Sequence, residues 1–317
     1  MTANEMSTRE QIVYYGGRDN FGEWQKAISR EIPDVDLVWH EGVTDPRHVR
    51  YAMVWKPPAD FFRPFSNLAL IANLGAGVDA ILAASDLPDV PITRIYDPGM
   101  ATLMSSYICF SVLRYARDIP RLEQQQRQKR WEYVRPRNPQ EIHVGFLGIG
   151  ELGGFAARDL VRLGFSVSGC SRSARPVEGV SRIYSLEHIR EFLRATEILV
   201  VMLPLTRETL GLVDAGLLAE LPRGAKIVNP ARGGIFREAD LIAALESGHI
   251  EAATLDTFEQ EPLPETSPFW TMPNVLITPH LAAHPVPWSS APQIAENIRR
   301  LRRGEKLLNE VFRSRGY

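Results

Sequence analysis

The chain has 317 residues, of which 44% are hydrophobic and 23% charged, a composition typical of a globular protein large enough for two domains. Its 36 basic and 38 acidic residues nearly cancel, which excludes the strongly basic surface of a nucleic-acid binder. No apolar run approaches the roughly 20 residues that span a bilayer, and Met1–Glu5 lacks the apolar stretch of a signal peptide. The two cysteines, Cys109 and Cys170, lie in apolar segments, so a reducing, cytoplasmic location is expected rather than a disulfide framework.

Strand-like and helical patterns alternate over the first hundred residues. This alternation predicts βαβ units and a parallel sheet. No glycine fingerprint follows any of these strands, so this region is expected to bind something other than a dinucleotide. The expected elements are strands at 12–15, 37–39, 52–55, 69–72 and 92–95, and a helix at 21–32.

A long helical pattern at 100–117 separates this region from the rest of the chain. The polar stretch 121–140 follows it, and its glutamines and arginines predict a solvated helix and loop, with a dimer-contacting arm as the alternative. From Ile142 the strand and helix alternation resumes. Near-continuous apolar runs there are typical of parallel strands covered on both faces, and they lie at 198–202, 225–228, 252–255 and 275–277.

A glycine fingerprint follows the first strand of this second region. The strand pattern 142–147 continues into Gly148-Ile149-Gly150-Glu151-Leu152-Gly153, and a helical pattern then extends to Leu163. The first glycine permits a tight turn, the second lets a pyrophosphate approach the backbone, and the third lets the helix pack on the strand. The helix N-terminus attracts the phosphates. A purely structural turn is the alternative, but the position between strand and helix favours a dinucleotide cradle of Gly148, Gly150, Glu151, Leu152 and Gly153.

The end of the next strand predicts which nicotinamide cofactor binds. An acidic residue roughly 20 positions after the fingerprint would bind the ribose 2′-hydroxyl of NADH, whereas a 2′-phosphate requires cations. This chain has Ser171, Arg172, Ser173 and Arg175 there and no acid. Arg172 is suited to a phosphate and its neighbours add donors, although two ordinary solvated arginines remain the alternative. We therefore predict NADPH, with NADH the weaker cofactor.

Reactive side chains follow successive expected strands in the second half of the chain: Arg232, Asp256, Glu261 and His280. Ligands of a doubly wound sheet bind outside the carboxyl ends of the strands, so these residues are expected to meet beside the nicotinamide. A lone arginine there is usually a surface residue, and a lone histidine is usually a core residue. Together, a guanidinium that holds a carboxylate, an imidazole that protonates a carbonyl, and a carboxylate behind the imidazole suit reduction of a 2-keto acid.

Several motifs resemble those of the D-isomer-specific 2-hydroxyacid dehydrogenase family, and within it the glyoxylate/hydroxypyruvate reductase A branch. The resemblance extends over essentially the whole chain. It is carried by Val54-Trp55-Lys56-Pro57-Pro58, Leu74-Gly75-Ala76-Gly77-Val78-Asp79, Asp97-Pro98-Gly99-Met100, Leu255-Asp256-Thr257-Phe258, Glu261-Pro262-Leu263-Pro264, Thr278-Pro279-His280 and the terminal Arg315-Gly316-Tyr317.

The resemblance implies a role for each member of the set. Arg232 would bind the substrate carboxylate and carbonyl, His280 would be the acid/base, and Glu261 would hydrogen-bond His280. Asp256 would help to seat the nicotinamide end of the cofactor. Homodimers joined through the cofactor domains are also implied. Further cofactor contacts are predicted at Leu203, Pro204, Pro230 and Ala231.

Substrate contacts are expected in the first region, at Trp55, Leu74, Gly75, Ala76 and Gly77. Two glycines with little side-chain cover make a plausible backbone nest for a carboxylate. A plain strand-to-helix turn with Asp79 as N-cap is the alternative, as is simple core packing for Trp55.

The favoured hypothesis is an NADPH-dependent reductase that converts glyoxylate to glycolate and hydroxypyruvate to D-glycerate. We expect a dinucleotide-binding Rossmann domain at 100–284, inserted in a flavodoxin-like substrate domain at 1–99 and 285–317. A dehydrogenase for a bulkier D-2-hydroxy acid, or a corepressor-like protein that only senses the cofactor, are the alternatives. No metal site is assigned, since Pro279 interrupts the helix that the spacing of His280 and His284 would need.

Overall fold

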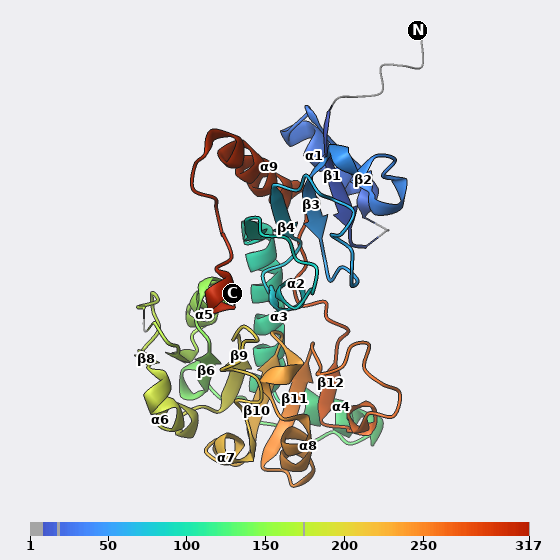
Figure 1. Cartoon of the computed structure of the whole chain (residues 1–317). Helices are drawn as coiled ribbons and strands as arrows, with labels where there is room; N and C mark the ends of the chain where they lie inside the picture. The colour runs from blue at the N-terminus through green and yellow to red at the C-terminus, as the bar shows by residue number, and fades with distance from the viewer. Residues whose placement is uncertain (1–8, 18–19, 174, 317) are drawn as a thin grey trace. The chain divides into compact units, whose positions relative to one another are not determined.

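The computed structural model describes residues 9–17, 20–173 and 175–316, so the N-terminal Met1–Glu5 segment and Tyr317 of the terminal motif lie outside the described residues. The chain divides into two compact units, residues 1–100 with 284–317 and residues 101–283. Each unit is built on its own parallel sheet (Figure 1).

Five strands form the sheet of the first unit in the described residues, in the order β2-β1-β3-β4-β5, with every neighbouring pair parallel. This is the doubly wound order of flavodoxin-like folds. Backbone hydrogen bonds from Arg94 to Asn309 and from Val311 to Ile92 hold the returning C-terminal segment against β5, and α9 packs on α1. The elements are β1 (Glu10–Tyr15), α1 (Phe21–Glu31), β2 (Val35–Trp39), β3 (Val49–Val54), β4 (Leu70–Asn73), α2 (Asp79–Leu82), β5 (Ile92–Arg94) and α9 (Pro287–Arg303).

Seven strands form the sheet of the second unit across the described part of the chain, in the order β12-β11-β10-β9-β6-β7-β8, again all parallel. The strands are β6 (His143–Leu147), β7 (Ser166–Cys170), β8 (Arg182–Tyr184), β9 (Ile198–Val201), β10 (Ala225–Asn229), β11 (Ile250–Leu255) and β12 (Val275–Ile277). The helices are α3 (Pro98–Ala116), which starts in the first unit, α4 (Ile119–Arg127), α5 (Glu151–Arg162), α6 (Ile189–Arg194), α7 (Ala215–Leu218) and α8 (Glu238–Glu246).

The order of the second sheet fixes where a ligand can bind. From β6 the chain builds outward to β7 and β8 on one side, then returns to β9 and continues to β12 on the other. Loops diverge at this reversal, and ligands of such sheets bind outside the carboxyl ends of the strands beside it. Because all seven strands are parallel, every one of their carboxyl ends lies at that same edge.

The predicted fold class is confirmed, including the expected strands in both sheets. Strand β8 was not expected from the sequence, because it has only three residues and two of them are partly or fully exposed. The polar stretch 121–140 contains most of α4 and continues in largely exposed backbone, as a solvated helix and loop should. Within the described residues, no helix is long and apolar enough to cross a membrane.

Candidate active site

The loop from β6 to α5 has the shape of a phosphate cradle. Gly148 adopts φ +93°, a conformation that strongly favours glycine, and its N–H donates to the Cys170 carbonyl at 2.8 Å. A Cβ at Gly153 would lie 2.7 Å from the Gly148 carbonyl oxygen, so the helix packs directly on the turn. A Cβ at Gly150 would meet nothing within 4 Å. The open space at Gly150, above the N-terminus of the 12-residue α5, therefore fits a pyrophosphate.

The end of β7 fits the adenosine end of the cofactor. The Ser171 hydroxyl is buried and makes no hydrogen bond within the described residues, so a donor and acceptor remain for a ligand. Arg172, Ser173 and Arg175 are exposed beside it, and no carboxylate occurs in 171–175. This donor set suits a phosphate on the ribose rather than a hydroxyl.

The remaining predicted cofactor contacts lie at the same edge of the sheet, because they follow the carboxyl ends of its strands or start α5. Glu151 and Pro204 are exposed, Leu152, Leu203 and Ala231 are half-buried, and Pro230 is buried. The structure thus gathers these residues with the cradle around the reversal of strand order.

Glu261 and His280 form a hydrogen-bonded pair. His280 Nδ1 lies 2.9 Å from Glu261 Oε2, and both side chains are largely buried, with 24% and 21% exposed. The other carboxylate oxygen, Oε1, accepts from the Phe258 N–H at 3.3 Å. A carboxylate only accepts, so Nδ1 must carry a proton toward it. Nε2 is then the ring nitrogen that can exchange a proton with a substrate.

The backbone at His280 is held in an unusual conformation. Its φ is +54°, which costs a non-glycine residue on the order of 1–3 kcal/mol and persists only where the surroundings enforce it. Asp256, which is 1% exposed, supplies that restraint. Its carbonyl accepts from the His280 N–H at 2.9 Å, and its carboxylate accepts from the N–H groups of Leu281 and Ala282, both at 2.9 Å.

Arg232 follows β10 at the start of a short 3-10 turn, Gly233–Ile235. Asn229, at the end of β10 and 1% exposed, shapes this turn, since its side-chain amide donates to the Arg232 carbonyl at 3.0 Å and its oxygen accepts from Ala231 N–H at 3.2 Å. The Arg232 guanidinium is half-buried and donates to the Ala231 carbonyl at 2.7 Å. The planar guanidinium group can donate two parallel hydrogen bonds to a carboxylate.

Gly233 brings the Arg232 turn against the segment that carries Glu261. A Cβ on this glycine would lie 2.0 Å from the Phe258 carbonyl carbon and 2.3 Å from the Glu259 nitrogen. The two backbones therefore touch, which places a cation and the His280–Glu261 pair at one sheet edge. Neither Asn229 nor Gly233 was predicted as a site residue, although a glycine is the residue that permits such a close approach because it has no Cβ.

The predicted substrate contacts of the first unit surround one loop after β4. The Trp55 ring packs on Gly75, where a Cβ would lie 2.3 Å from Cζ3, so Trp55 borders this loop rather than lying deep in the core. The Asn73 side chain donates to the carbonyls of Gly75 and Gly77, both at 2.9 Å. Ala76 and Gly77 are half-buried, whereas Leu74 is 5% exposed and belongs to the core.

One local alternative in this loop is wrong. Asp79 was considered as the N-cap of the following helix, but α2 begins at Asp79 and the N-cap position belongs to Val78. The turn is instead ordered by Asn73, whose side-chain amide donates to two carbonyls further along the loop.

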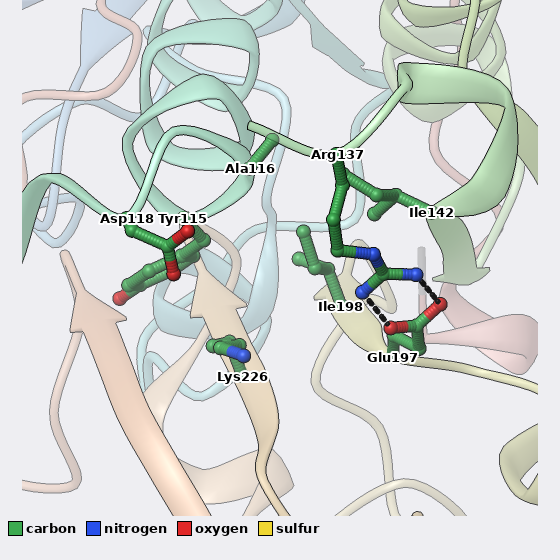
Figure 2. A pocket seen from close by; sticks show the side chains of 8 residues that line it. All are labelled: Tyr115, Ala116, Asp118, Arg137, Ile142, Glu197, Ile198 and Lys226. Atoms are coloured by element: carbon green, nitrogen blue, oxygen red, sulfur yellow. Dashed lines mark hydrogen bonds and ion pairs between the residues drawn. The ribbon is translucent and has the colours of Figure 1, made fainter. Parts of the chain in front are cut away.

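A cavity of about 40 Å³ lies at the opposite edge of the second sheet, near the starts of β9 and β10 (Figure 2). Arg137 pairs there with Glu197 at 2.6 Å, and Lys226 pairs with Glu251 at 3.0 Å. Because its cations are already paired, this cavity offers little to an anionic ligand. Across the residues that the structure describes, no group of three His, Cys, Asp or Glu side chains is placed to hold a metal ion.

Comparison with known proteins points to one family. The model of the D-isomer specific 2-hydroxyacid dehydrogenase NAD binding domain matches residues 109–282. The chain is 36% identical over 313 residues to glyoxylate/hydroxypyruvate reductase A of Yersinia enterocolitica, covering 96% of this chain and 99% of that protein. It is 39% identical over 301 residues to the protein of that name in Serratia proteamaculans, covering 93% and 96%.

Two solved structures match nearly all of the chain. A D-isomer specific 2-hydroxyacid dehydrogenase from Xanthobacter autotrophicus Py2, in complex with NADPH and MES, is 53% identical with a TM-score of 0.93, covering 98% of this chain and 100% of that one. An NADPH-dependent glyoxylate/hydroxypyruvate reductase from Sinorhizobium meliloti, in complex with NADP and sulfate, is 34% identical with a TM-score of 0.92 and the same coverage. The predicted family resemblance is confirmed.

Gly233→Ala should disturb the site, because the added methyl group meets backbone that cannot rotate away. We expect a loss of about 1–3 kcal/mol in the free energy of unfolding, as for other overpacked positions. Thermal and denaturant unfolding would measure it. Gly234→Ala is the matched control, since its Cβ would meet only the ends of Leu205 and Leu210 at 3.4 Å. Equal stability of the two variants would contradict the close approach.

Proposed function

The chain belongs to the D-isomer-specific 2-hydroxyacid dehydrogenase family, and on that premise we propose that it is an NADPH-dependent reductase of small 2-keto acids. It reduces glyoxylate to glycolate and hydroxypyruvate to D-glycerate. The observation that carries the proposal is the His280–Glu261 pair, which lies at the same sheet edge as the Gly148–Gly153 cradle. The relatives named glyoxylate/hydroxypyruvate reductase A support the choice of substrates.

NADPH, when bound, supplies the hydride that reaches the keto carbon. The cradle at Gly148, Gly150 and Gly153 holds its pyrophosphate, and Ser171 with Arg172 holds the 2′-phosphate. Two relatives of known structure carry NADPH or NADP, which supports this preference. NADH, which lacks the phosphate, binds more weakly.

His280 is the proton donor. As hydride arrives, negative charge develops on the keto oxygen, and a proton on Nε2 neutralises it. Glu261 accepts the Nδ1–H bond and thereby fixes the orientation of the ring. Arg232 holds the substrate carboxylate through its two-pronged guanidinium, which aligns the reacting carbon.

The first unit provides further substrate contacts through the backbone of 75–77 and the Trp55 ring. The Asn73 hydrogen bonds that order this loop support its use as a fixed recognition surface. On this proposal residues 1–99 with 285–317 form the substrate-binding domain, and residues 100–284 form the dinucleotide-binding domain.

NADPH oxidation with glyoxylate, hydroxypyruvate, pyruvate and phenylpyruvate tests the reaction. We expect the two smallest polar substrates to have the highest kcat/KM. His280→Ala should lower kcat by about 100- to 10,000-fold, the usual contribution of a general acid, while NADPH binding measured by fluorescence is retained. Arg232→Ala should likewise lose catalysis and keep cofactor binding.

Other results of the same assay would overturn the proposal. A preference for phenylpyruvate would indicate a dehydrogenase for bulkier D-2-hydroxy acids. Tight NADPH binding without oxidation by any of the four keto acids would indicate a protein that only senses the cofactor.

Arg172→Ala should change cofactor preference. Loss of one charge-assisted hydrogen bond to the phosphate should lower kcat/KM for NADPH by about 10- to 100-fold and leave that for NADH nearly unchanged. Arg162→Ala is the control, because Arg162 is an exposed arginine at the far end of α5, paired with Asp159. An equal loss with both cofactors would contradict recognition of the 2′-phosphate.

We further propose that the protein is a cytoplasmic homodimer. Large apolar side chains are exposed on α3, α4 and the segment after α4, all in the second unit. Trp131 is fully exposed and Tyr133 is 83% exposed, and the group also includes Phe110, Leu113 and Leu122. Aromatic residues are enriched at protein–protein interfaces, and a second copy of the chain is the partner that the family resemblance implies.

Trp131→Glu should weaken the dimer by burying a charge at its interface. We expect light scattering after size-exclusion chromatography to shift from dimer to monomer. Leu163→Glu, at an exposed leucine outside the group, is the control and should remain dimeric. A wild-type protein that is monomeric at all concentrations would refute the proposal.

A further inference from the structure

A chain of hydrogen bonds connects helix α3 to the loop that carries His280. The Tyr107 hydroxyl lies 2.7 Å from Thr278 Oγ1, and the Thr278 hydroxyl donates to Asp256 Oδ1 at 2.6 Å. A threonine hydroxyl has one proton, and a carboxylate can only accept. Tyr107 must therefore donate to Thr278, so that the chain has one direction, from the tyrosine through the threonine to the aspartate.

The Asp256 carboxylate, at the end of this series of hydrogen bonds, is the group that restrains the backbone around His280. Both flanking segments of the histidine are bonded to Asp256: Thr278 on one side, and Leu281 and Ala282 on the other. These three hydrogen bonds occupy most of the acceptor capacity of the carboxylate. The orientation of the carboxylate therefore fixes the positions of the three donor groups. One acceptor site on Oδ2 remains, which is compatible with the predicted contact of Asp256 to the nicotinamide end.

We propose that Tyr107 and Thr278 are positioning residues for catalysis. By orienting the Asp256 carboxylate they hold His280 in its left-handed conformation and its ring against Glu261. This inference rests on the proposed function, because it assigns the effect to the proton donor of that reaction.

Tyr107 is suited to be a fixed donor. It is 9% exposed, and burial raises the pKa of its hydroxyl, so it keeps its proton throughout the pH range of the enzyme. It belongs to a long helix rather than to a loop, so its position is set independently of the segment that it restrains.

The same helix supplies a matched control. Eight residues further along, the buried Tyr115 hydroxyl lies 2.7 Å from Thr254 Oγ1. Thr254 is the penultimate residue of the core strand β11, and within the described residues its hydroxyl bonds to Tyr115 and not to the loop 278–282. Tyr107→Phe and Tyr115→Phe thus remove the same hydroxyl from similar surroundings, but only the first removes a restraint on the loop.

The test compares the two variants in the NADPH-bound enzyme with glyoxylate or hydroxypyruvate. We expect Tyr107→Phe to lower kcat roughly 10-fold or more, because small misplacements of a catalytic group are costly, with little change in KM. Tyr115→Phe should keep the wild-type kcat. Thermal unfolding should be shifted to a similar degree in both variants, which would exclude a general loss of stability as the cause.

Thr278 provides a second, independent arm. Thr278→Val preserves shape but breaks the chain, and should reduce kcat as Tyr107→Phe does. Thr278→Ser keeps the hydroxyl and should restore most of the activity. If Tyr107→Phe and Tyr115→Phe have the same kcat, or if Thr278→Val is as active as Thr278→Ser, the positioning role is wrong. An inactive wild type with an intact fold would instead refute the proposed function.

Discussion

The buried carboxylate of Asp256 is the constraint on which the site depends. A carboxyl group that is 1% exposed is tolerated only where hydrogen bonds replace its hydration. The Asp256 carboxylate oxygens accept hydrogen bonds from Thr278, Leu281 and Ala282, all of which belong to the loop 278–282. The hydrogen bonds that the buried Asp256 side chain requires therefore also fix the backbone around His280. Without these bonds, the positive φ of His280 would be unfavourable. Removing the carboxylate would release the loop as well as expose unpaired amides.

The parallel sheet explains why the other groups lie within reach of this loop. Carboxyl ends of neighbouring strands lie at one edge, so residues that follow β10, β11 and β12 are neighbours although they are far apart in sequence. Close backbone contact at Gly233 then brings the Arg232 turn onto the segment before Glu261. The cradle after β6 lies at the same edge. The sheet topology alone therefore brings the cofactor cradle and the acid/base residues to the same edge.

The apolar runs of the sequence locate the strand ends, and the structure places Arg232, Glu261 and His280 after β10, β11 and β12 as expected. Their catalytic roles stay predictions. The hydrogen bond between Glu261 and His280 was expected from the family resemblance and from the chemistry of a carboxylate behind an imidazole, and the structure contains it. The groups that shape the backbone were not predicted. Asn229, Asn73 and Tyr107 act through contacts with carbonyls or hydroxyls that depend on the tertiary fold. The left-handed conformation of His280 was also missed, since no glycine or asparagine marks it.

Substrate choice has a different physical origin from the reaction. In the roles that we propose for them, Arg232 and His280 would meet the carboxylate and the carbonyl oxygen that every 2-keto acid has, so these two residues would not distinguish one keto acid from another. Discrimination must come from groups around the substrate side chain. An apolar wall distinguishes one methylene by only about 1–3 kcal/mol, whereas a polar group left unpaired by the wrong substrate discriminates far more strongly. A reductase for hydroxypyruvate therefore needs a hydrogen-bonding partner for the substrate hydroxyl. The loop 75–77, which is held by hydrogen bonds from Asn73 to the Gly75 and Gly77 carbonyls, is the segment of the first unit that we propose for this role.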